Sequence, residues 1–580
     1  MNDTLIVKPA SCKDCHKCLR ECPVAAIGFK DSQAFIIEEK CIYCGNCIKT
    51  CPQGAKSALF EEKKLEAFLE SDSYLIASIA PSFVTAFPDL KPGQLIQALK
   101  IIGFDYIAET AEAATRVVKQ FKKEREKMDS TLITSCCPAV VNLIEKHYPE
   151  VLPQLAPVLS PMMLQTAELK NNFDCARVIF IGPCLAKIEE SKNEKRRDYR
   201  PDIVITFEHL RIFLEEQGIK ISELDSADVD LPATHLTADY ALSGGAVKAA
   251  DLLKADPGCG NKALHLSGLE NIINFLEDFK RDKDKIDVEM VELLACSGGC
   301  INGPAINNDL SIPLKELEVH NYLSTSKRNN YKKTPSLENE RSINEISVRR
   351  KHKNKKISLP EVPESEIKKI LTSIAKENKE DEKDCGGCGY SSCREKAAAV
   401  FYGFAEKKMC IPYMKSRAES LSQIIVESSH NAIIVVNDQM KIQKFNPVAK
   451  ELFTQKSREL QGMKLDKFMD SSSFQKAWNL NQRLIHQKCS YKNGSITVDQ
   501  TIFALREHKV IVGILTDISE QEKQRRKMQK MKEVAVEKTN DVVNKQVQTV
   551  QEIAGLLGET TVETKAALTE LSELLQAGDD

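Results

Sequence analysis

Two segments near the start of the chain carry cysteines at the same spacing. Residues 12–23 read CKDCHKCLRECP and residues 41–52 read CIYCGNCIKTCP, each C-x2-C-x2-C-x3-C-P. This run is typical of proteins with two [4Fe–4S] clusters, in which the fourth cysteine of each run binds the other cluster. The expected ligand sets are Cys12, Cys15, Cys18 and Cys51 for one cluster and Cys22, Cys41, Cys44 and Cys47 for the second. A pair of zinc knuckles is the alternative, and the function that the clusters indicate is electron transfer.

A further cysteine group lies in the second half of the chain, with the spacing Cys385-x2-Cys388-x4-Cys393-x16-Cys410. Three ligands on a glycine-rich loop and a fourth after a helix would close another cubane, with zinc as the alternative. The pattern resembles the small [4Fe–4S] domain of corrinoid iron–sulfur proteins and redox-complex ferredoxins. We expect this third accessory cluster to be an outlet for electrons.

Three shorter cysteine motifs lie between these groups: TSCCPAVV (134–141), IGPCLAKIEE (181–190) and LLACSGGCINGP (293–304). Each follows an apolar run or lies in a turn, so a folded chain could bring their thiols around one buried cluster. Gly298, Gly299 and Gly303 would let the backbone approach an inorganic centre closely.

These three motifs resemble the H-cluster signatures of iron-only ([FeFe]) hydrogenases, and the resemblance covers about residues 1–310. It implies that a [4Fe–4S] cubane is held by Cys137, Cys184, Cys296 and Cys300. Cys300 would also bridge to a diiron subsite with CO, cyanide and azadithiolate ligands. The resemblance further implies that Cys136 is the proton-donating thiol, and that Lys187 and Ser82 donate hydrogen bonds to cyanide.

The chain departs from this family along the outward proton route. Ala113 and Arg116 take the positions of the family's glutamates, and Ala156 takes the position of its serine. Glu109 and Glu112 are candidate substitutes. Because proton relays need titratable groups within hydrogen-bond reach, we expect slow turnover. The motifs themselves also differ, with Gly182, Leu294 and Val140 where the family commonly has Met, Met and Trp.

The elements that must position these residues indicate an α/β multidomain chain. Its 580 residues suggest about four domains. We expect a ferredoxin-like two-cluster α+β module (1–60), an iron-only hydrogenase α/β domain (61–325), a basic linker (326–358) and a small helical [4Fe–4S] module (359–416). The linker is expected to be solvated, with a patch for an acidic partner or nucleic acid as the alternative.

The C-terminal part carries no metal pattern. Strands are predicted at 432–437, 441–446, 496–505 and 509–517, with a helix at 447–453. Their order, Asn446 and the closing Asp517–Ile518–Ser519 resemble a PAS domain (417–520) with an α+β fold. A signalling or coiled-coil-like helix (521–580) follows, with an apolar stripe that suits a partner helix. Packing of this helix on its own PAS domain is the alternative.

Composition excludes several classes of protein. Lys+Arg 81 against Asp+Glu 83 leaves a net charge of −2, so no global basic field indicates nucleic acid. No apolar run is long enough for a membrane span, and the first residues lack an export signal, so we expect a cytoplasmic protein. Clustered cysteines then indicate metal rather than disulfides. The isolated Cys175, Cys259 and Cys489 are expected to be buried.

The leading hypothesis is a sensory hydrogenase-like protein that senses H2 or redox state at an H-cluster. It would signal through the PAS domain and terminal helix to an unidentified output protein, and a homodimer is one expected form. The first alternative is a catalytic ferredoxin-dependent hydrogenase (H2 = 2H+ + 2e−), with ferredoxin or another redox partner. The second is an electron-transfer protein with cubane clusters only.

Overall fold

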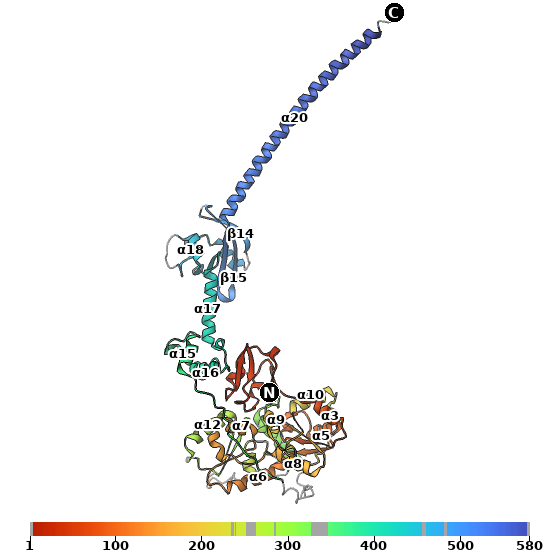
Figure 1. Ribbon diagram of the computed structural model, residues 1–580, viewed down its shortest axis with the longest axis vertical. Helices are drawn as coiled ribbons and strands as arrows, with labels where there is room; N and C mark the ends of the chain where they lie inside the picture. Colours follow the sequence, from red (N-terminus) through yellow and green to blue (C-terminus); the bar gives the residue numbers. More distant parts are fainter. Residues whose placement is uncertain are drawn as a thin grey trace. The chain divides into compact units, whose positions relative to one another are not determined.

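The computed structural model describes residues 4–233, 237, 239–250, 263–283, 286–325, 346–454, 460–480, 484–492 and 494–576. The chain divides into two compact units, Met1–Met414 and Lys415–Asp580, and each has its own hydrophobic core. Figure 1 shows the elements of both. In the described part of the chain, no helix combines the length and apolar character needed to cross a bilayer.

The first unit begins with a small module of two antiparallel strand pairs. β1 (Leu5–Val7) pairs with β4 (Lys56–Ala58), and β2 (Ile27–Lys30) pairs with β3 (Gln33–Ile36). The first two cysteine runs follow β1 and β3. The third cysteine of each run lies in a single-turn helix, Cys18 in α1 (Lys17–Arg20) and Cys47 in α2 (Asn46–Lys49).

The body of this unit contains two parallel sheets. The first has the order β6 (Tyr106–Glu109), β5 (Leu75–Ile79), β8 (Arg177–Gly182) and β9 (Ile203–Thr206). The second has the order β10 (Ala263–Ser267), β11 (Met290–Leu294) and β7 (Leu132–Ile133). β5, β9, β11 and β7 are buried along their whole length, as expected for parallel strands covered on both faces.

Helices connect and cover these sheets. Around the four-stranded sheet they are α3 (Glu62–Leu69), α4 (Phe83–Ala86), α5 (Pro92–Ile101), α8 (Pro161–Asn172), α9 (Leu185–Asn193) and α10 (Phe207–Glu216). The remaining helices of the body are α6 (Ala111–Arg125), α7 (Pro138–His147), α11 (Gly245–Ala249), α12 (Leu269–Arg281) and α13 (Ile312–Thr325). α7 and α8 begin with proline, whose missing N–H costs nothing at a helix start.

The carboxyl ends of the strands carry the residues that matter for function. Ala80–Pro81–Ser82 follows β5, Cys184 follows β8, Cys136 and Cys137 follow β7, and Cys296 follows β11. This arrangement agrees with the prediction that the three motifs lie at strand ends or turns. It also places them where open α/β sheets bind ligands.

A small helical part completes the first unit. It contains α15 (Glu364–Thr372), α16 (Cys393–Phe401) and a short 3-10 turn at Lys407–Met409, before α17 (Ile411–Glu427) begins directly after Cys410.

Residues 346–356 of the predicted solvated linker (326–358) are docked on the body along one edge, although most of them remain exposed. Leu159 N donates to Val348 O (2.8 Å) and Arg350 N donates to Pro157 O (3.0 Å), so the segment lies against the body as an added strand-like stretch. The His352 side chain is buried, with Nε2 2.8 Å from the Ala156 carbonyl oxygen. The run of basic residues hid this docking, because the carboxylates that pair with them come from distant helices. Residues 326–345 lie outside the described residues.

The isolated cysteines also differ from expectation. Cys175 is exposed, in a turn with a positive φ of 58°, and Cys489 is half-buried. Cys259 lies outside the described residues.

The second unit contains an antiparallel sheet in the order β13-β12-β16-β15-β14. The strands are β12 (Ala432–Asn437), β13 (Ile442–Phe445), β14 (Leu484–Tyr491), β15 (Ile496–Leu505) and β16 (Val510–Asp517), and the helices are α18 (Pro447–Phe453) and α19 (Ser472–Leu480). Four of these strands and α18 match the predicted elements. β14 was missed because its sequence, LIHQKCSY, lacks alternation. Asn446 caps α18 through its side chain, which accepts from Ala449 N.

The terminal helix α20 (Ser519–Gln576) is a continuous helix of 58 residues. Its apolar stripe is exposed, from 49% at Val543 to 64% at Val550. Gly555 and Gly558 do not end the helix. Within the described residues, the alternative that this stripe packs on the preceding domain is therefore wrong.

Candidate metal centre and its cavity

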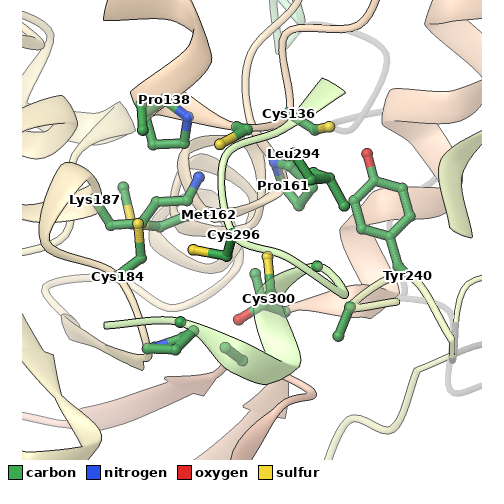
Figure 2. A pocket seen from close by; sticks show the side chains of 18 of the residues that line it. Cys136, Pro138, Pro161, Met162, Cys184, Lys187, Tyr240, Leu294, Cys296 and Cys300 are labelled. Atoms are coloured by element: carbon green, nitrogen blue, oxygen red, sulfur yellow. The ribbon is translucent and has the colours of Figure 1, made fainter. Parts of the chain in front are cut away.

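A cavity of about 100 Å³ lies at the carboxyl ends of both parallel sheets. Residues of all three central motifs line it, together with apolar side chains such as Pro138, Pro161 and Met162. Figure 2 shows these side chains around one space. Apart from thiols, one ammonium, one phenol and Thr110, the lining is apolar, so the cavity is suited to a group that must be kept from water.

Four predicted ligands contribute to the wall of this cavity: Cys137, Cys184, Cys296 and Cys300. Burial raises the pKa of Cys184 to about 12 and also raises those of Cys296 and Cys300, and the neighbouring thiols add to each shift. Thiols that raise one another's pKa lie close together, and iron would stabilise the thiolates that burial disfavours. Cys300 retains accessible surface because it faces the cavity.

The fit to a cubane cluster also shows in the backbone around these cysteines. Gly299 has φ +93°, and a Cβ there would lie 2.5 Å from Ala241 O. A Cβ on Gly303 would lie 2.6 Å from Pro183 Cβ. These glycines let the loop of Cys300 close onto neighbouring chain segments. That they also let the backbone approach an inorganic centre stays a prediction.

Cys136, the predicted proton donor, lies in the cavity wall beside two residues that sequence reasoning missed. Its pKa is raised to about 12, by burial first and then by Glu292. Tyr240 also lines the cavity, and burial, Cys136 and Glu292 all raise its pKa. A hydrogen bond between the Tyr240 hydroxyl and the Cys136 thiol contributes to this shift, so the two groups lie side by side in the cavity wall.

Glu292 is a carboxyl group inside an apolar strand. It is 1% exposed, and its Oε2 accepts from Ala246 N (3.1 Å) and Val247 N (3.2 Å). Burial raises its pKa to about 8 despite these bonds, so the group carries a proton at neutral pH. One acid in the buried strand MVELL was the signal that could have found it.

Lys187 reaches the cavity from α9 and is held there by an ion-pair network. Its Nζ lies 2.9 Å from Glu190 Oε2, and Arg350 Nη1 lies 2.7 Å from Glu190 Oε1. Ser160 Oγ donates to the same carboxylate at 3.0 Å. Burial alone would raise the pKa of Glu190, but Lys187, Arg350 and Ser160 outweigh it and lower that pKa. A buried carboxylate with these partners fixes the position of the Lys187 ammonium.

Ser82 is fully buried just beyond Pro81, although it is not among the residues that line the cavity. Its Oγ finds no hydrogen-bond partner among the described residues. A buried hydroxyl without a partner is costly in a folded protein. An acceptor on a bound group would remove this cost, so Ser82 fits the predicted donor role.

The positions of the family's outward proton route are filled by apolar packing. Ala113 and Ala156 are both completely buried, in one cluster with Val117 and Leu164. Arg116 is held by Glu112 at 2.6 Å and also pairs with Glu168. The family's positions on this route are thus filled by two alanines and by an arginine held in ion pairs.

Glu109 is committed to other contacts. Its Oε2 accepts from Ala233 N at 2.7 Å and its Oε1 accepts from the Tyr322 hydroxyl at 2.5 Å. Glu112 is likewise committed to Arg116. The two candidate substitutes are thus structural groups in this fold.

The ferredoxin-like module lies against the cavity. Cys44 lines the cavity wall, and Gly45 is so close to the body that a Cβ there would lie 2.4 Å from Pro304 Cβ. Lys146 Nζ donates to Cys41 O at 2.6 Å. The structure brings Cys22 near Cys41, Cys44 and Cys47, each of whose pKa values it helps to raise after the larger effect of burial.

The other predicted cluster of this module, formed by Cys12, Cys15, Cys18 and Cys51, has a buried lysine beside it. Burial raises the pKa of Cys18, whereas Lys56 donates to its thiol and opposes that shift.

The third cysteine group lies against the first cysteine run. Arg20 Nη1 donates to both Cys15 O (3.3 Å) and Gly387 O (3.5 Å), and Phe29 N donates to Phe404 O (3.0 Å). The group therefore neighbours the ferredoxin-like module, with Cys18 and Cys388 in the same apolar cluster.

A buried lysine also lies among the cysteines of this third group. Lys396 is 2% exposed and donates to Lys407 O at 2.9 Å. Burial lowers its pKa, and Cys410, Cys388 and Cys393 oppose that shift.

In the described part of the chain, no three His, Cys, Asp or Glu side chains are placed to hold a single metal ion.

Comparison with known families agrees with this arrangement. Residues 73–304 match the family "Iron only hydrogenase large subunit, C-terminal domain", and residues 4–52 match the "4Fe-4S dicluster domain". Residues 381–412 match a family of Fe–S cluster domains. These three matches cover the residues around the cavity, the first two cysteine runs and the third cysteine group, respectively.

Individual relatives are of two kinds. The NADP-reducing hydrogenase subunit HndD of Solidesulfovibrio fructosivorans is 25% identical over 48% of this chain and 58% of its own length. Cytosolic iron-sulfur assembly component 3 of Bos taurus is 23% identical over 50% of this chain and 75% of its own. The chain thus spans little more than half of the hydrogenase relative. A solved variant of [FeFe]-hydrogenase HydA1 from Chlamydomonas reinhardtii is 17% identical, with a TM-score of 0.41, over 52% of this chain and 100% of that chain.

Proposed function

We propose that the protein is a sensory iron–sulfur protein that uses an H-cluster to respond to H2 or to redox state. The observation that carries the proposal is the cavity. Four predicted ligand cysteines, the additional thiol of Cys136 and the ammonium of Lys187 face the same apolar space. A protein with cubane clusters alone would have no need of Cys136 or Lys187 there.

The residues at and near the cavity would have separate roles. When bound, the diiron group would supply the site at which H2 is split or formed. Cys136 Sγ would accept and return the proton, since a thiol in the wall can reach both a bound group and the Tyr240 side of the cavity. Lys187 and Ser82 would hold anionic ligands by hydrogen bonds, while Pro138, Pro161 and Met162 exclude water.

A sensing role is favoured over fast catalysis by the packing along the family's proton route. Ala113 and Ala156 lie in a dry apolar cluster, and Arg116 is bound between Glu112 and Glu168. Protons must therefore leave the cavity by another route, and Tyr240 and the protonated Glu292 are the candidate groups along it. Slow exchange suits a sensor, whose task is to change state rather than to turn over substrate.

Electrons would pass between the cavity and the third accessory cluster by way of the ferredoxin-like module. Cys44 adjoins the cavity, and the first cysteine run adjoins the loop of Cys388. The third cluster would then be the terminus of the chain of clusters. Its last ligand, Cys410, directly precedes α17, through which a redox change could reach the rest of the protein.

The second unit would be the output. Its sheet order, the Asn446 cap and the two short helices support a PAS domain. The exposed stripe of α20 supports a homodimer or an output partner that binds a helix.

The test is anaerobic infrared spectroscopy of the full chain after loading with a synthetic diiron precursor. Sharp CO and cyanide bands that shift under H2 are expected. Cys136→Ala should keep the bands but lose the response to H2, whereas Cys175→Ala, at an exposed cysteine, should change neither. Absence of bands with all cubanes loaded would refute the H-cluster, and rapid turnover would favour a catalytic hydrogenase.

A further inference from the structure

A second hollow lies on the opposite side of Glu190 from the metal cavity. It is a surface groove of about 640 Å³ between the end of α9 and the docked segment 346–356. The loop after α9 contributes Lys195 and Arg196, and the segment contributes Arg349, Arg350, Lys351, Lys353 and Lys355.

The positive charge of this groove is only partly balanced. The carboxylates that line it are Glu145, Glu190 and Glu194, and each already has a cationic partner within the groove: Lys355, Arg350 and Arg196. Arg349 pairs with Glu124 from outside the groove. The ammonium groups of Lys195, Lys351 and Lys353 are exposed and form no ion pair with the described residues.

The groove and the metal cavity share the Glu190 carboxylate. Arg350 lines the groove and binds one oxygen of Glu190, whereas Lys187 lines the cavity and binds the other. The exposed fraction of the Glu190 side chain is 1%, so water screens neither contact strongly. A ligand that competes for Arg350 would leave Glu190 to bind Lys187 more tightly.

We propose that this groove binds a small polyphosphate anion, and that its binding is coupled through Arg350 and Glu190 to Lys187. Guanidinium and ammonium groups with the Ser347 hydroxyl form the donor set that phosphate oxygens require. Nucleic acid suits the groove less well, because its lining contains no aromatic side chain for base stacking.

Binding is tested by isothermal titration calorimetry of the full chain with inorganic pyrophosphate at low ionic strength. Saturable binding is expected, and Lys351→Ala with Lys353→Ala should weaken it by at least about tenfold, because two charge-assisted hydrogen bonds are lost. Lys356→Ala, an exposed lysine of the same segment outside the groove, is the matched control. No saturable binding, or equal weakening by the control, would overturn the site. Binding of an oligonucleotide in place of pyrophosphate would overturn the ligand class.

The coupling to Lys187 rests on the proposed function, but the binding does not. In protein loaded with the diiron precursor, saturating pyrophosphate should shift the cyanide bands, and Arg350→Lys should reduce that shift. If the two sites are coupled, loading with the diiron precursor must in turn change the affinity for pyrophosphate. Binding without a band shift would overturn the coupling alone, whereas absence of all bands would count against the proposed function and leave the calorimetric result intact.

Discussion

One buried carboxylate, Glu145, contributes to the docking of residues 346–356, and its removal has a calculable effect. Glu145 lies in α7 with its side chain 2% exposed; Lys355 Nζ lies 2.6 Å from its Oε2, and Lys353 N donates to its Oε1 at 3.0 Å. Burial alone would raise the pKa of Glu145, but bonds from His352, Lys355 and Lys353 lower it from 4.5 to about 2. At about 1.4 kcal/mol per unit, the contacts stabilise the charged form by roughly 3 kcal/mol.

The sign of this effect sets its pH dependence. Because the folded pKa lies below the unfolded one, the stabilisation is complete above about pH 4.5 and is lost as the pH falls towards about 2. At neutral pH, Glu145→Gln should therefore lose most of this stabilisation, since glutamine keeps the shape of the side chain but not its charge.

Hydrogen exchange measured by mass spectrometry on the full chain would show the loss. The amides of Arg350 and Lys355 donate to backbone carbonyls of the body, so a peptide over 346–356 reports docking. A loss of roughly 3 kcal/mol corresponds to about a hundredfold fall in protection. Glu66→Gln, an exposed carboxylate on α3, should change nothing. Unchanged protection in Glu145→Gln would refute the electrostatic account, and an equal loss throughout the body would show global rather than local opening.

Three further predictions concern other parts of the chain. Phe474→Ala empties a fully buried position against Gly513 and should destabilise the second unit by about 3–5 kcal/mol. The chain has one tryptophan, at 478, so denaturation followed by its fluorescence reports this unit alone, and an unchanged midpoint would contradict the packing. Lys396→Met should make the third cluster's reduction potential more negative in an EPR-monitored titration, because a buried positive charge favours the reduced cluster; exposed Lys383→Met is its control. Asp substitutions at Val547 and Val550, which are 50% and 64% exposed, should abolish any dimer seen by analytical ultracentrifugation, whereas retention of the dimer would place its interface elsewhere.

The candidate site was largely readable from the sequence because cysteine spacing constrains chemistry directly. The cysteines predicted as ligands, which line the cavity, and the strand ends that carry them follow from local patterns. Tyr240 and Glu292 could not be found in this way, since their significance depends on which distant segments surround Cys136. Glu292 is nevertheless recognisable in the sequence as a single acidic residue in an apolar strand.

The docked segment shows the other limit of sequence reasoning. The run VRRKHKNKKIS reads as a solvated basic stretch because each of its charges is local, while Glu124, Glu145 and Glu190, which neutralise it, lie on α6, α7 and α9. Charge patterns along a chain do not reveal partners that only tertiary folding supplies. The strand β14 was missed for a related reason, because its pairing with β15, rather than its own alternation, makes it a strand.

The contact between the first cysteine run and the third cysteine group also concerns how the protein is made. Asp31 N donates to Glu406, 375 residues later in the chain. At a synthesis rate of about 5–20 residues per second, the surface beside the first run stays uncovered for roughly 20 to 75 seconds during translation. The first cysteine run is therefore accessible for iron–sulfur delivery only until the ribosome has released the third cysteine group and Phe404 can cover Phe29.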